Sequence, residues 1–468
     1  MVNKYLEELK SKQNIHIVGA AGIEGAAIAV FLFEQGIQNV ILHDFSKKEE
    51  FESSFKNSRS YLTPKKAKES YERLISTNYK IYYQDNYLKN IEKADLIFIS
   101  QGWYRYEANR RLKALKVKIP FSSVTELYFK LSPCPIIGIT GTVGKSTTTR
   151  LIYEMIKKCE RLAYLSGNDR DNPPVLDKLL KLSKNAYLVL EISNRQLIDL
   201  KYSPHIAVVT NIFPNHPDDH KNFSEYIKIK SNIVRYQTKK DFAVLNADNK
   251  ETREFKNLTA AKAYFFSLKE EKREKDLKKA VILGEHNRAN IMAAALVGRI
   301  LKLKKADVFR ALSDFKGLKH RLEFIKKKGG IYFYEDSQST SPYSTAVAIE
   351  AFKGKNMILI AGGFRAQAKE SDYSDPVSKF FMPQVKAVML IGRVASIIQN
   401  EYFRQKRIKP HGPDFIKNCG DLPQAMDEVK NLAKKGDVVV LSPGAESFGE
   451  FRDYRHRGEV FRKLVDKF

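Results

Sequence analysis

One stretch near residue 140 restricts the possible fold more than any other part of the sequence. Apolar, β-branched residues at 135–140 predict a strand, the turn at 141–146 carries Gly-Lys-Ser, and residues 150–158 predict a helix. Glycines in such a turn let backbone N–H groups face phosphate oxygens, while the lysine and the hydroxyl supply a cation and a Mg²⁺ ligand. The stretch therefore predicts an α/β sheet that binds ATP or GTP.

The glycine spacing identifies the type of loop. In the common longer motif the first glycine would fall on Ile139, whereas this chain has Gly138 one residue earlier. The spacing is instead that of the shorter pattern Gly-Thr-x-Gly-Lys-Ser-Thr. A chance succession of strand, turn and helix is the alternative.

The length and the cysteines bound the class of protein. A chain of 468 residues predicts two to three domains. It has no apolar run long enough for a membrane span, and its first ten residues carry acids rather than a signal core. The three cysteines, Cys134, Cys159 and Cys419, show no metal-binding or disulfide spacing. We therefore expect a cytoplasmic protein, and we expect it to be a monomer.

The net charge of +27 is the most unusual bulk property. It could serve nucleic acid, an anionic membrane surface or anionic substrates. Because the lysines are spread along the whole chain, we expect a solvated basic surface and no dedicated nucleic-acid site. A basic, ATP-dependent nucleic-acid-binding protein remains the alternative.

The N-terminal third predicts a Rossmann-like domain. A strand at 14–18 leads through a glycine turn at 19–25 into a helix that reaches Glu34, and a second strand at 40–42 ends at Asp44. The glycines follow G-x-x-G-x-x-G, which does not favour a redox dinucleotide. The turn fits a UDP-type ligand or close packing of helix on strand.

Two strand ends in the central part carry candidate ligands. The strand at 188–193 delivers Glu191, which suits Mg²⁺ or, alternatively, a structural cap. The strand at 206–212 leads into a polar cluster, which predicts a site, a zinc centre built on His216, Asp218 and His220, or a plain polar loop. Its members are Asn211, Asn215, His216, Asp218, Asp219 and His220.

The last third repeats the alternation of strands and helices. Strands are predicted at 331–335, 357–361, 387–391 and 438–441, most of them ending in small and polar residues. The fold class is therefore α/β with three domains. We expect a Rossmann-like UDP-binding domain at 1–133, a central ATP-binding domain with a mostly parallel sheet at 134–317, and a Rossmann-like domain at 318–468.

Five motifs in order resemble those of the Mur ligases, the ATP-dependent amide-forming enzymes of peptidoglycan precursor synthesis. They lie at 141–147, 211–220, 284–290, 320–323, and 441–448 with 457–458. The resemblance implies an ATP-dependent ligase that adds glutamate, D-glutamate in the first place, to UDP-N-acetylmuramoyl-L-alanine through an acyl phosphate. The third domain would bind the incoming amino acid.

The resemblance also implies the ligands of ATP and of two Mg²⁺ ions. Lys145 would hold the β- and γ-phosphates, Ser146 and Glu191 one Mg²⁺, and His216 with Lys230 the second. Lys230 matches the lysine that is carbamylated in this family. Lys145, His216, Lys230 and Arg321 would be catalytic, with Arg321 on the phosphates. The ATP-binding residues would be Gly141, Thr142, Gly144, Lys145, Ser146, Thr147, Asn287 and Asn290 at adenine, and Asp336 at the ribose.

Substrate contacts follow from the same resemblance, with departures. They would come from Asn168, near the UDP-sugar, and from Thr340, Arg365, Ser447 and Phe448. Gln338 and Ala366 stand where the D-glutamate enzymes have lysines that receive the amino acid. Asn194 and Arg195 replace Ser-Phe, and Val143 replaces an Asn. The acceptor, whether D-glutamate, L-glutamate or another amino acid, therefore stays open, as does a phosphate-loop protein without catalysis.

Overall fold

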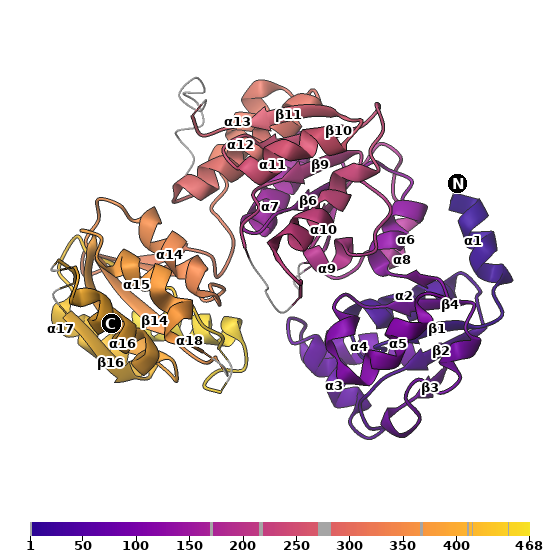
Figure 1. The fold of residues 1–468 in the computed structure, drawn as a ribbon, viewed down its shortest axis with the longest axis horizontal. Coiled ribbons are helices and arrows are strands. Elements are labelled where there is room, and N and C mark those ends of the chain that lie inside the picture. The colour runs from indigo at the N-terminus through magenta and orange to yellow at the C-terminus, as the bar shows by residue number, and fades with distance from the viewer. Residues whose placement is uncertain are drawn as a thin grey trace. The chain divides into compact units, whose positions relative to one another are not determined.

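The computed structural model describes residues 2–168, 172–214, 219–269, 282–365, 368–409, 411–413, 415–447 and 449–468. It contains three β-sheets flanked by helices, and nearly all neighbouring strands in them are parallel (Figure 1). The chain forms two compact units. One comprises Met1–Lys278 with Ala289–Leu312, and the other Lys279–Arg288 with Ser313–Phe468. The predicted α/β class is confirmed, whereas the three domain boundaries stay a prediction.

The first sheet has the strand order β3-β2-β1-β4-β5 and is parallel throughout. Its inner strands β1 and β4 are buried on both faces and apolar except for His16, as expected when helices cover a parallel sheet. The strands are β1 (Ile15–Val18), β2 (Val40–His43), β3 (Lys80–Tyr82), β4 (Leu96–Ile99) and β5 (Phe121–Ser122). The helices are α1 (Val2–Ser11), α2 (Ile23–Glu34), α3 (Phe51–Ser58), α4 (Pro64–Ile75), α5 (Arg110–Leu115) and α6 (Val124–Leu131).

The second sheet, in the same unit, has the order β11-β10-β9-β6-β8-β7. Its strands are β6 (Ile136–Thr140), β7 (Ala163–Gly167), β8 (Tyr187–Glu191), β9 (Ile206–Val209), β10 (Phe242–Asn246) and β11 (Lys262–Phe266). Its helices are α7 (Lys145–Lys158), α8 (Leu176–Leu179), α9 (Asn194–Leu197), α10 (Phe223–Arg235), α11 (Lys250–Glu254), α12 (Glu285–Ile300) and α13 (Lys305–Ser313). Since β6 lies between β8 and β9, the carboxyl ends of these three strands meet at one edge.

The third sheet belongs to the other unit and has the order β12-β13-β17-β14-β15-β16. Only the β12–β13 pair of this described sheet is antiparallel. Its strands are β12 (Glu323–Lys328), β13 (Ile331–Glu335), β14 (Met357–Gly362), β15 (Val385–Ile391), β16 (Phe415–Gly420) and β17 (Val438–Leu441). The helices are α14 (Pro342–Ala351), α15 (Ser374–Phe380), α16 (Ala395–Lys406), α17 (Leu422–Leu432) and α18 (Tyr454–Lys467).

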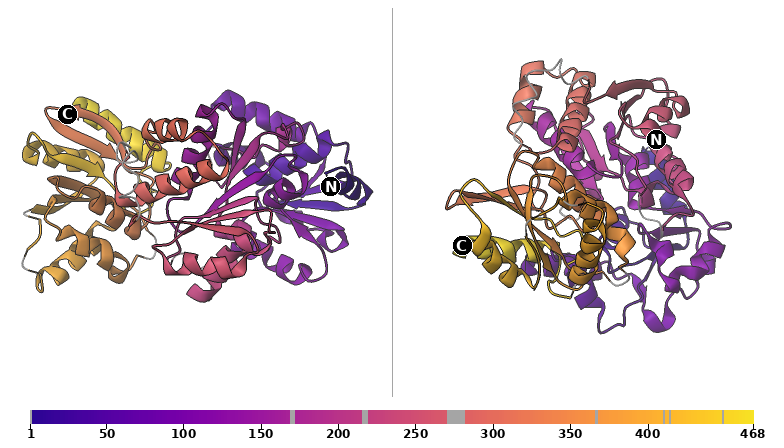
Figure 2. Two further views of the ribbon diagram at one scale, coloured as in Figure 1. Left: turned by 90° about the horizontal axis from the view of Figure 1, so that it is seen from above. Right: turned by 60° about the vertical axis from the view of Figure 1, so that its left-hand side comes forward.

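The strands at the rims of the sheets differ from the buried inner ones. The rim strands β3, β11, β12 and β16 each carry an exposed lysine, namely Lys80, Lys262, Lys327 and Lys417. Inner strands such as β14 and β17 are fully buried. Figure 2 shows the twist of the sheets from two further directions.

The structure corrects the start of one predicted helix. The helix predicted from Arg150 begins at Lys145, because Gly144 turns the chain in the left-handed region and the threonines that follow pack inside. Among the described residues, no helix combines the length and the apolar character needed to cross a bilayer.

Candidate functional site

The turn between β6 and α7 has a backbone that requires glycine at two positions. Gly141 has φ +155°, and a Cβ placed there would lie 1.9 Å from Oγ1 of Thr210. Gly144 has φ +86°, and a Cβ there would lie 2.4 Å from Oδ1 of Asn290. Both glycines therefore permit a close approach of the turn to its neighbours. The second distance also places Asn290, a predicted adenine contact, directly beside the turn.

Residues at the end of β9 fix the shape of the turn. Asn211 makes two hydrogen bonds to Val143: its Oδ1 accepts from the backbone N–H and its Nδ2 donates to the carbonyl, both at 2.9 Å. Thr210 Oγ1 donates to the same carbonyl at 2.6 Å. On the other side, the hydroxyl groups of Thr142 and Tyr226 lie 3.2 Å apart. The turn is thus held from two elements, β9 and α10.

Two lysines converge on the same turn. Nζ of Lys145 donates to the carbonyls of Gly141 at 3.1 Å and Thr142 at 3.0 Å. Nζ of Lys230, from α10, donates to the Gly141 carbonyl at 2.9 Å and to Thr140 Oγ1 at 3.2 Å. Both predicted cationic residues are therefore brought to the phosphate-binding turn.

Lys230 differs from Lys145 in its burial. Its side chain is buried, whereas Lys228, two residues earlier on α10, is exposed. Burial and the positive charge of Lys145 lower the pKa of Lys230 well below its usual range, and Glu191 partly offsets this. A lysine in such surroundings favours the neutral amine, which is the nucleophilic form.

Glu191 ends β8 beside this pair of lysines. It is buried, and its Oε1 accepts a 2.9 Å hydrogen bond from Nδ2 of Asn168 at the end of β7. Its Oε2 is also buried and has no hydrogen-bond partner among the described residues. A buried carboxylate oxygen without a donor is costly unless a cation compensates it. Glu191 thus fits Mg²⁺ better than it fits a structural cap.

His220 and Asp219 are the last two residues of the polar cluster after β9. Nε2 of His220 lies 2.9 Å from Nδ2 of Asn194, and its neighbour Asp219 pairs with Arg195 and Arg105. Nδ1 of His220 is buried without a hydrogen-bond partner among the described residues. Asn215, His216 and Asp218 lie outside the described residues, so the predicted role of His216 and the alternative zinc centre both stay predictions.

In the other unit, Asp336 organises the turn that carries Arg321. Its Oδ1 accepts from Leu322 N at 3.1 Å, and its Oδ2 accepts from the hydroxyl groups of Ser339 and Ser442. Both neighbours of Arg321 have positive φ, +63° at His320 and +44° at Leu322. Such a backbone is strained, and strain of this kind is characteristic of functional turns. The predicted ribose contact of Asp336 stays a prediction.

The other predicted substrate residues lie at strand ends of the same sheet. Thr340 is exposed after β13, and Ser447 is buried after β17. Arg365 follows β14 and lies 3.7 Å from a carboxylate oxygen of Asp372.

Asn287, the second predicted adenine contact, lies in the first turn of α12, and its side chain donates to the Leu283 carbonyl at 2.7 Å. Phe448 and Ala366 lie outside the described residues.

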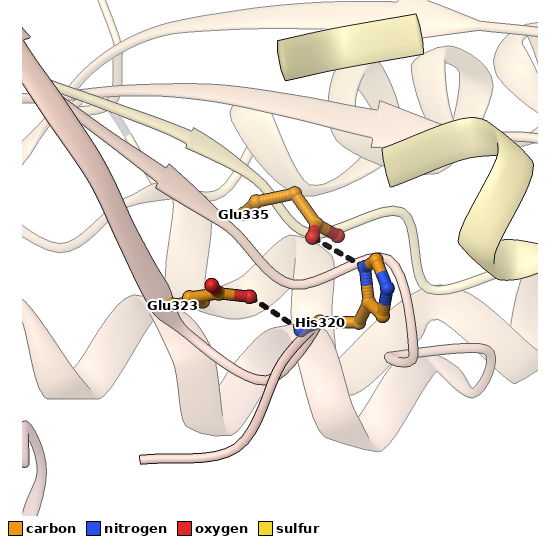
Figure 3. Close-up of side chains that lie close together, drawn as sticks. All are labelled: His320, Glu323 and Glu335. Carbon is orange, nitrogen blue, oxygen red and sulfur yellow. Dashed lines mark hydrogen bonds and ion pairs between the residues drawn. The ribbon is translucent and has the colours of Figure 1, made fainter. Parts of the chain in front are cut away.

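A histidine and two glutamates cluster beneath the Arg321 turn (Figure 3). Nδ1 of His320 lies 2.6 Å from Oε2 of Glu335, and Glu323 accepts from the backbone N–H of His320 at 2.9 Å. Arg462 pairs with both carboxylates. Burial alone would raise the pKa of Glu335, but its bond to His320 leaves it lowered. The cluster is therefore an ion-pair network rather than a metal centre.

A cavity of about 50 Å³ lies within the first unit, at the carboxyl ends of β4 and β5. Glu24 of α2 and Gln101, which follows β4, line it on one side, and Arg195 and Gln196 of α9 line it on the other. Burial raises the pKa of Glu24 to about 7. The cavity lies at the sheet edge where open α/β sheets bind ligands.

Sequence reasoning did not single out Thr210 or Tyr226 as contacts of the turn. It named Asn168 but did not predict the bond to Glu191, and the role of Asn168 near the UDP-sugar stays a prediction. Asn168 carried a usable signal, since it follows Gly167 at a strand end. Thr210 and Tyr226 carried none, because their contacts depend on how β9 and α10 pack on β6.

The chain is similar to proteins of known family. The family model of the Mur ligase middle domain matches residues 139–298, and the model of the Mur ligase glutamate ligase domain matches residues 320–444. The UDP-N-acetylmuramoylalanine–D-glutamate ligase of Acetivibrio thermocellus is 34% identical, over 86% of this chain and 89% of that one. The enzyme of the same name from Caldanaerobacter subterraneus is 32% identical, over 98% and 99%.

Solved structures share the fold at lower sequence identity. The UDP-N-acetylmuramate-alanine ligase of Thermotoga maritima has a TM-score of 0.58 and 17% identity, over 97% of this chain and 99% of that one. MurF of Acinetobacter baumannii has a TM-score of 0.59 and 14% identity, over 99% and 98%. At these identities the likeness concerns the fold alone.

Proposed function

Because this chain belongs to the Mur ligase family, we propose that it is an ATP-dependent ligase that joins D-glutamate to UDP-N-acetylmuramoyl-L-alanine. The observation that carries the proposal is the convergence of Lys145, Lys230 and Glu191 on one glycine turn, with a carboxylate oxygen of Glu191 left without a donor. A protein that only bound nucleotide would not need this set. The substrates are those of the UDP-N-acetylmuramoylalanine–D-glutamate ligases that the chain resembles.

In the first step, the terminal carboxylate of the UDP-linked substrate attacks the γ-phosphorus of ATP. The bond to the β,γ-bridging oxygen breaks, so that an acyl phosphate and ADP result. Charge accumulates on the transferring oxygens, and the positive groups of Lys145 and Arg321 stabilise it. The backbone N–H groups of the turn orient the phosphates.

Ser146 and Glu191 would hold one Mg²⁺, and His216 with Lys230, the lysine as a carbamate, would hold the second. Mg²⁺, when bound, neutralises charge on the phosphoryl oxygens. The neutral amine that the surroundings of Lys230 favour can attack CO₂ at carbon, and loss of the amine proton then leaves a carbamate anion. Glu191 and this carbamate would supply the anionic oxygens that Mg²⁺ prefers.

In the second step, the amine of the incoming amino acid attacks the acyl carbon. A C–N bond forms, the amine loses a proton, and phosphate leaves. Thr340, Ser447 and Phe448 would contact the acceptor. Arg365 would pair with its side-chain carboxylate, where Gln338 and Ala366 supply no cation.

The three parts of the chain would divide the ligands between them. Residues 1–133 would bind the UDP moiety, 134–317 ATP, and 318–468 the acceptor. Asn287 and Asn290 would contact adenine, and Asp336 the ribose. Asn168 would act mainly on Glu191, which it already contacts.

The test is phosphate release by the purified protein with Mg²⁺-ATP, UDP-N-acetylmuramoyl-L-alanine and a panel of amino acids that includes both enantiomers of glutamate. We expect release that requires the UDP-linked substrate and D-glutamate, with a matching mass gain on the nucleotide product. If L-glutamate or another amino acid supports release and D-glutamate does not, the protein is still a ligase but the proposed acceptor is wrong. No release with any acceptor, from protein that still binds ATP, would contradict the proposal.

A further inference from the structure

Arg457 is a fully buried arginine in the first turn of α18. Its side chain is 0% exposed. Nη2 donates to the carbonyls of Ser337 at 2.9 Å and Ala445 at 3.1 Å, and Nη1 donates to that of Glu446 at 3.2 Å. The guanidinium group therefore binds backbone rather than a carboxylate.

The three carbonyls belong to two loops that are far apart in sequence. Ser337 lies in the loop after β13, which continues to Thr340, and Ala445 and Glu446 lie in the loop after β17, which continues to Ser447. The loops are also joined by the hydrogen bond from Gly444 N to the Ser339 carbonyl at 2.9 Å. Arg457 thus ties together the two loops that carry proposed acceptor contacts.

Burying this charge is costly, which argues for a specific role. Burial lowers the pKa of Arg457 to about 10, although Glu335, Glu450 and Asp336 nearby favour the charged form. A planar group with several N–H donors in a fixed fork suits carbonyls that come from two segments. The next residue must be small, since a Cβ on Gly458 would lie 2.7 Å from Nδ1 of His320.

A second buried arginine repeats this arrangement in the first unit. Arg59 is 5% exposed, and its guanidinium donates to the carbonyls of Ala21 at 2.9 Å, Gly22 at 3.2 Å and Phe55 at 3.1 Å. Its guanidinium also lies 3.5 Å from the centre of the Phe55 ring. Ala21 and Gly22 form the glycine turn between β1 and α2. Arg59 therefore fixes the turn expected to receive the UDP moiety.

We propose that Arg457 and Arg59 are positioning residues that act on different substrates: Arg457 sets the two loops that receive the acceptor amino acid, and Arg59 sets the glycine turn that receives the UDP moiety. The inference rests on the proposed function for the identity of the two substrates. Neither arginine needs to touch a substrate itself.

The experiment compares Arg457→Lys with Arg59→Lys in the full-length protein, and each variant is the matched control of the other. Lysine keeps the charge but replaces the guanidinium fork, whose two terminal nitrogens bond three carbonyls, with a single nitrogen. We expect Arg457→Lys to raise KM for the acceptor about 10-fold while KM for the UDP-linked substrate stays near wild type, and Arg59→Lys to do the reverse. Equal shifts of both KM values in each variant would overturn the inference.

Amide hydrogen exchange provides a readout that does not need activity. We expect Arg457→Lys to speed exchange at 336–341 and 442–447 and to leave 19–25 unchanged, with the opposite pattern in Arg59→Lys. Unchanged exchange in the named loops would contradict the inference. If exchange changes as expected but the wild type ligates no amino acid, the proposed function fails and the tethering of the loops stands. Arg457→Gln replaces the lysine variant if that variant does not fold.

Discussion

Glu191 is the residue whose burial most directly predicts a chemical role. One carboxylate oxygen is bonded to Asn168, and the other is buried without a donor among the described residues. Glu191→Gln keeps the shape and can still accept from Asn168, but it removes the anion. We expect the ligation rate to fall by about 10²-fold or more, because the metal loses a charged ligand.

The measurement for Glu191→Gln is phosphate release over a Mg²⁺ titration, with thermal unfolding as the control for folding. An unchanged rate at saturating ATP and Mg²⁺ would show that Glu191 does not bind the metal. The ligation rate should fall less in Asn168→Ala, since this substitution removes only a contact that orients Glu191.

Asp336 gives a prediction about pH. Burial raises its pKa from the usual 3.8 to about 6, against the lowering effect of Ser339, Ser442 and Arg321. Between these values the folded protein binds more protons than the unfolded chain, so its contribution to the free energy of unfolding falls as pH rises from 4 to 6. Between pH 4 and 6 the free energy of unfolding of the wild type should therefore fall by about 2–3 kcal/mol more than that of Asp336→Asn. Urea unfolding at a series of pH values measures this difference.

Glu401 is the control of opposite sign. Arg404 holds its pKa down at about 2, with Gln405 as a further donor. Here the unfolded chain binds more protons between about pH 2 and 4.5, so stability rises with pH through that window. If Asp336→Asn and Glu401→Gln shifted the pH dependence in the same direction, the environment inferred for Asp336 would be wrong.

At the scale of elements, the turn between β6 and α7 depends on its glycine backbone. Gly144→Ala meets both a positive φ and the Asn290 side chain, whereas Gly354→Ala meets a positive φ of +80° with nothing within 4 Å. Each should lose about 1–2 kcal/mol of stability from backbone strain. Only Gly144→Ala should also weaken ATP binding, as measured by calorimetry, and equal ATP affinity in both variants would contradict the role of the turn.

The sequence predicted elements whose signals are local. Strands β6, β8 and β14 were found because apolar runs end at glycines or polar residues. Strands β12 and β16 were missed, since they are half-exposed rim strands in which lysines interrupt the apolar pattern. The start of α7 was placed five residues late, because a run of threonines disfavours a helix when its burial is not known.

The candidate site divides in the same way. Lys145 and Glu191 were predictable, because a glycine turn and a strand end mark them in the sequence. The bond between Asn168 and Glu191 was not, since it forms only when β7 pairs with β8, and 23 residues separate the two. Likewise, nothing near Arg457 in the sequence shows that its partners are Ser337 and Ala445.

For the whole molecule, the charge of +27 leads to a prediction about nucleic acid. Because basic residues are spread over both units, we expect weak, sequence-independent binding to duplex DNA that disappears as salt rises toward physiological strength. Fluorescence anisotropy against a salt titration measures this. Tight binding that persists at physiological salt would support the nucleic-acid-binding alternative and weaken the ligase proposal.

The lysines on the rim strands have a consequence for how the chain behaves at high concentration. A rim strand offers unpaired backbone groups to any other strand that approaches it, which is how soluble proteins begin to form fibres. Lys80, Lys262 and Lys327 place a positive charge on three such rims, whereas Lys417 on the fourth pairs with Glu428. Two copies that meet rim to rim therefore repel each other. Part of the excess charge thus protects a protein with three open sheets from aggregation.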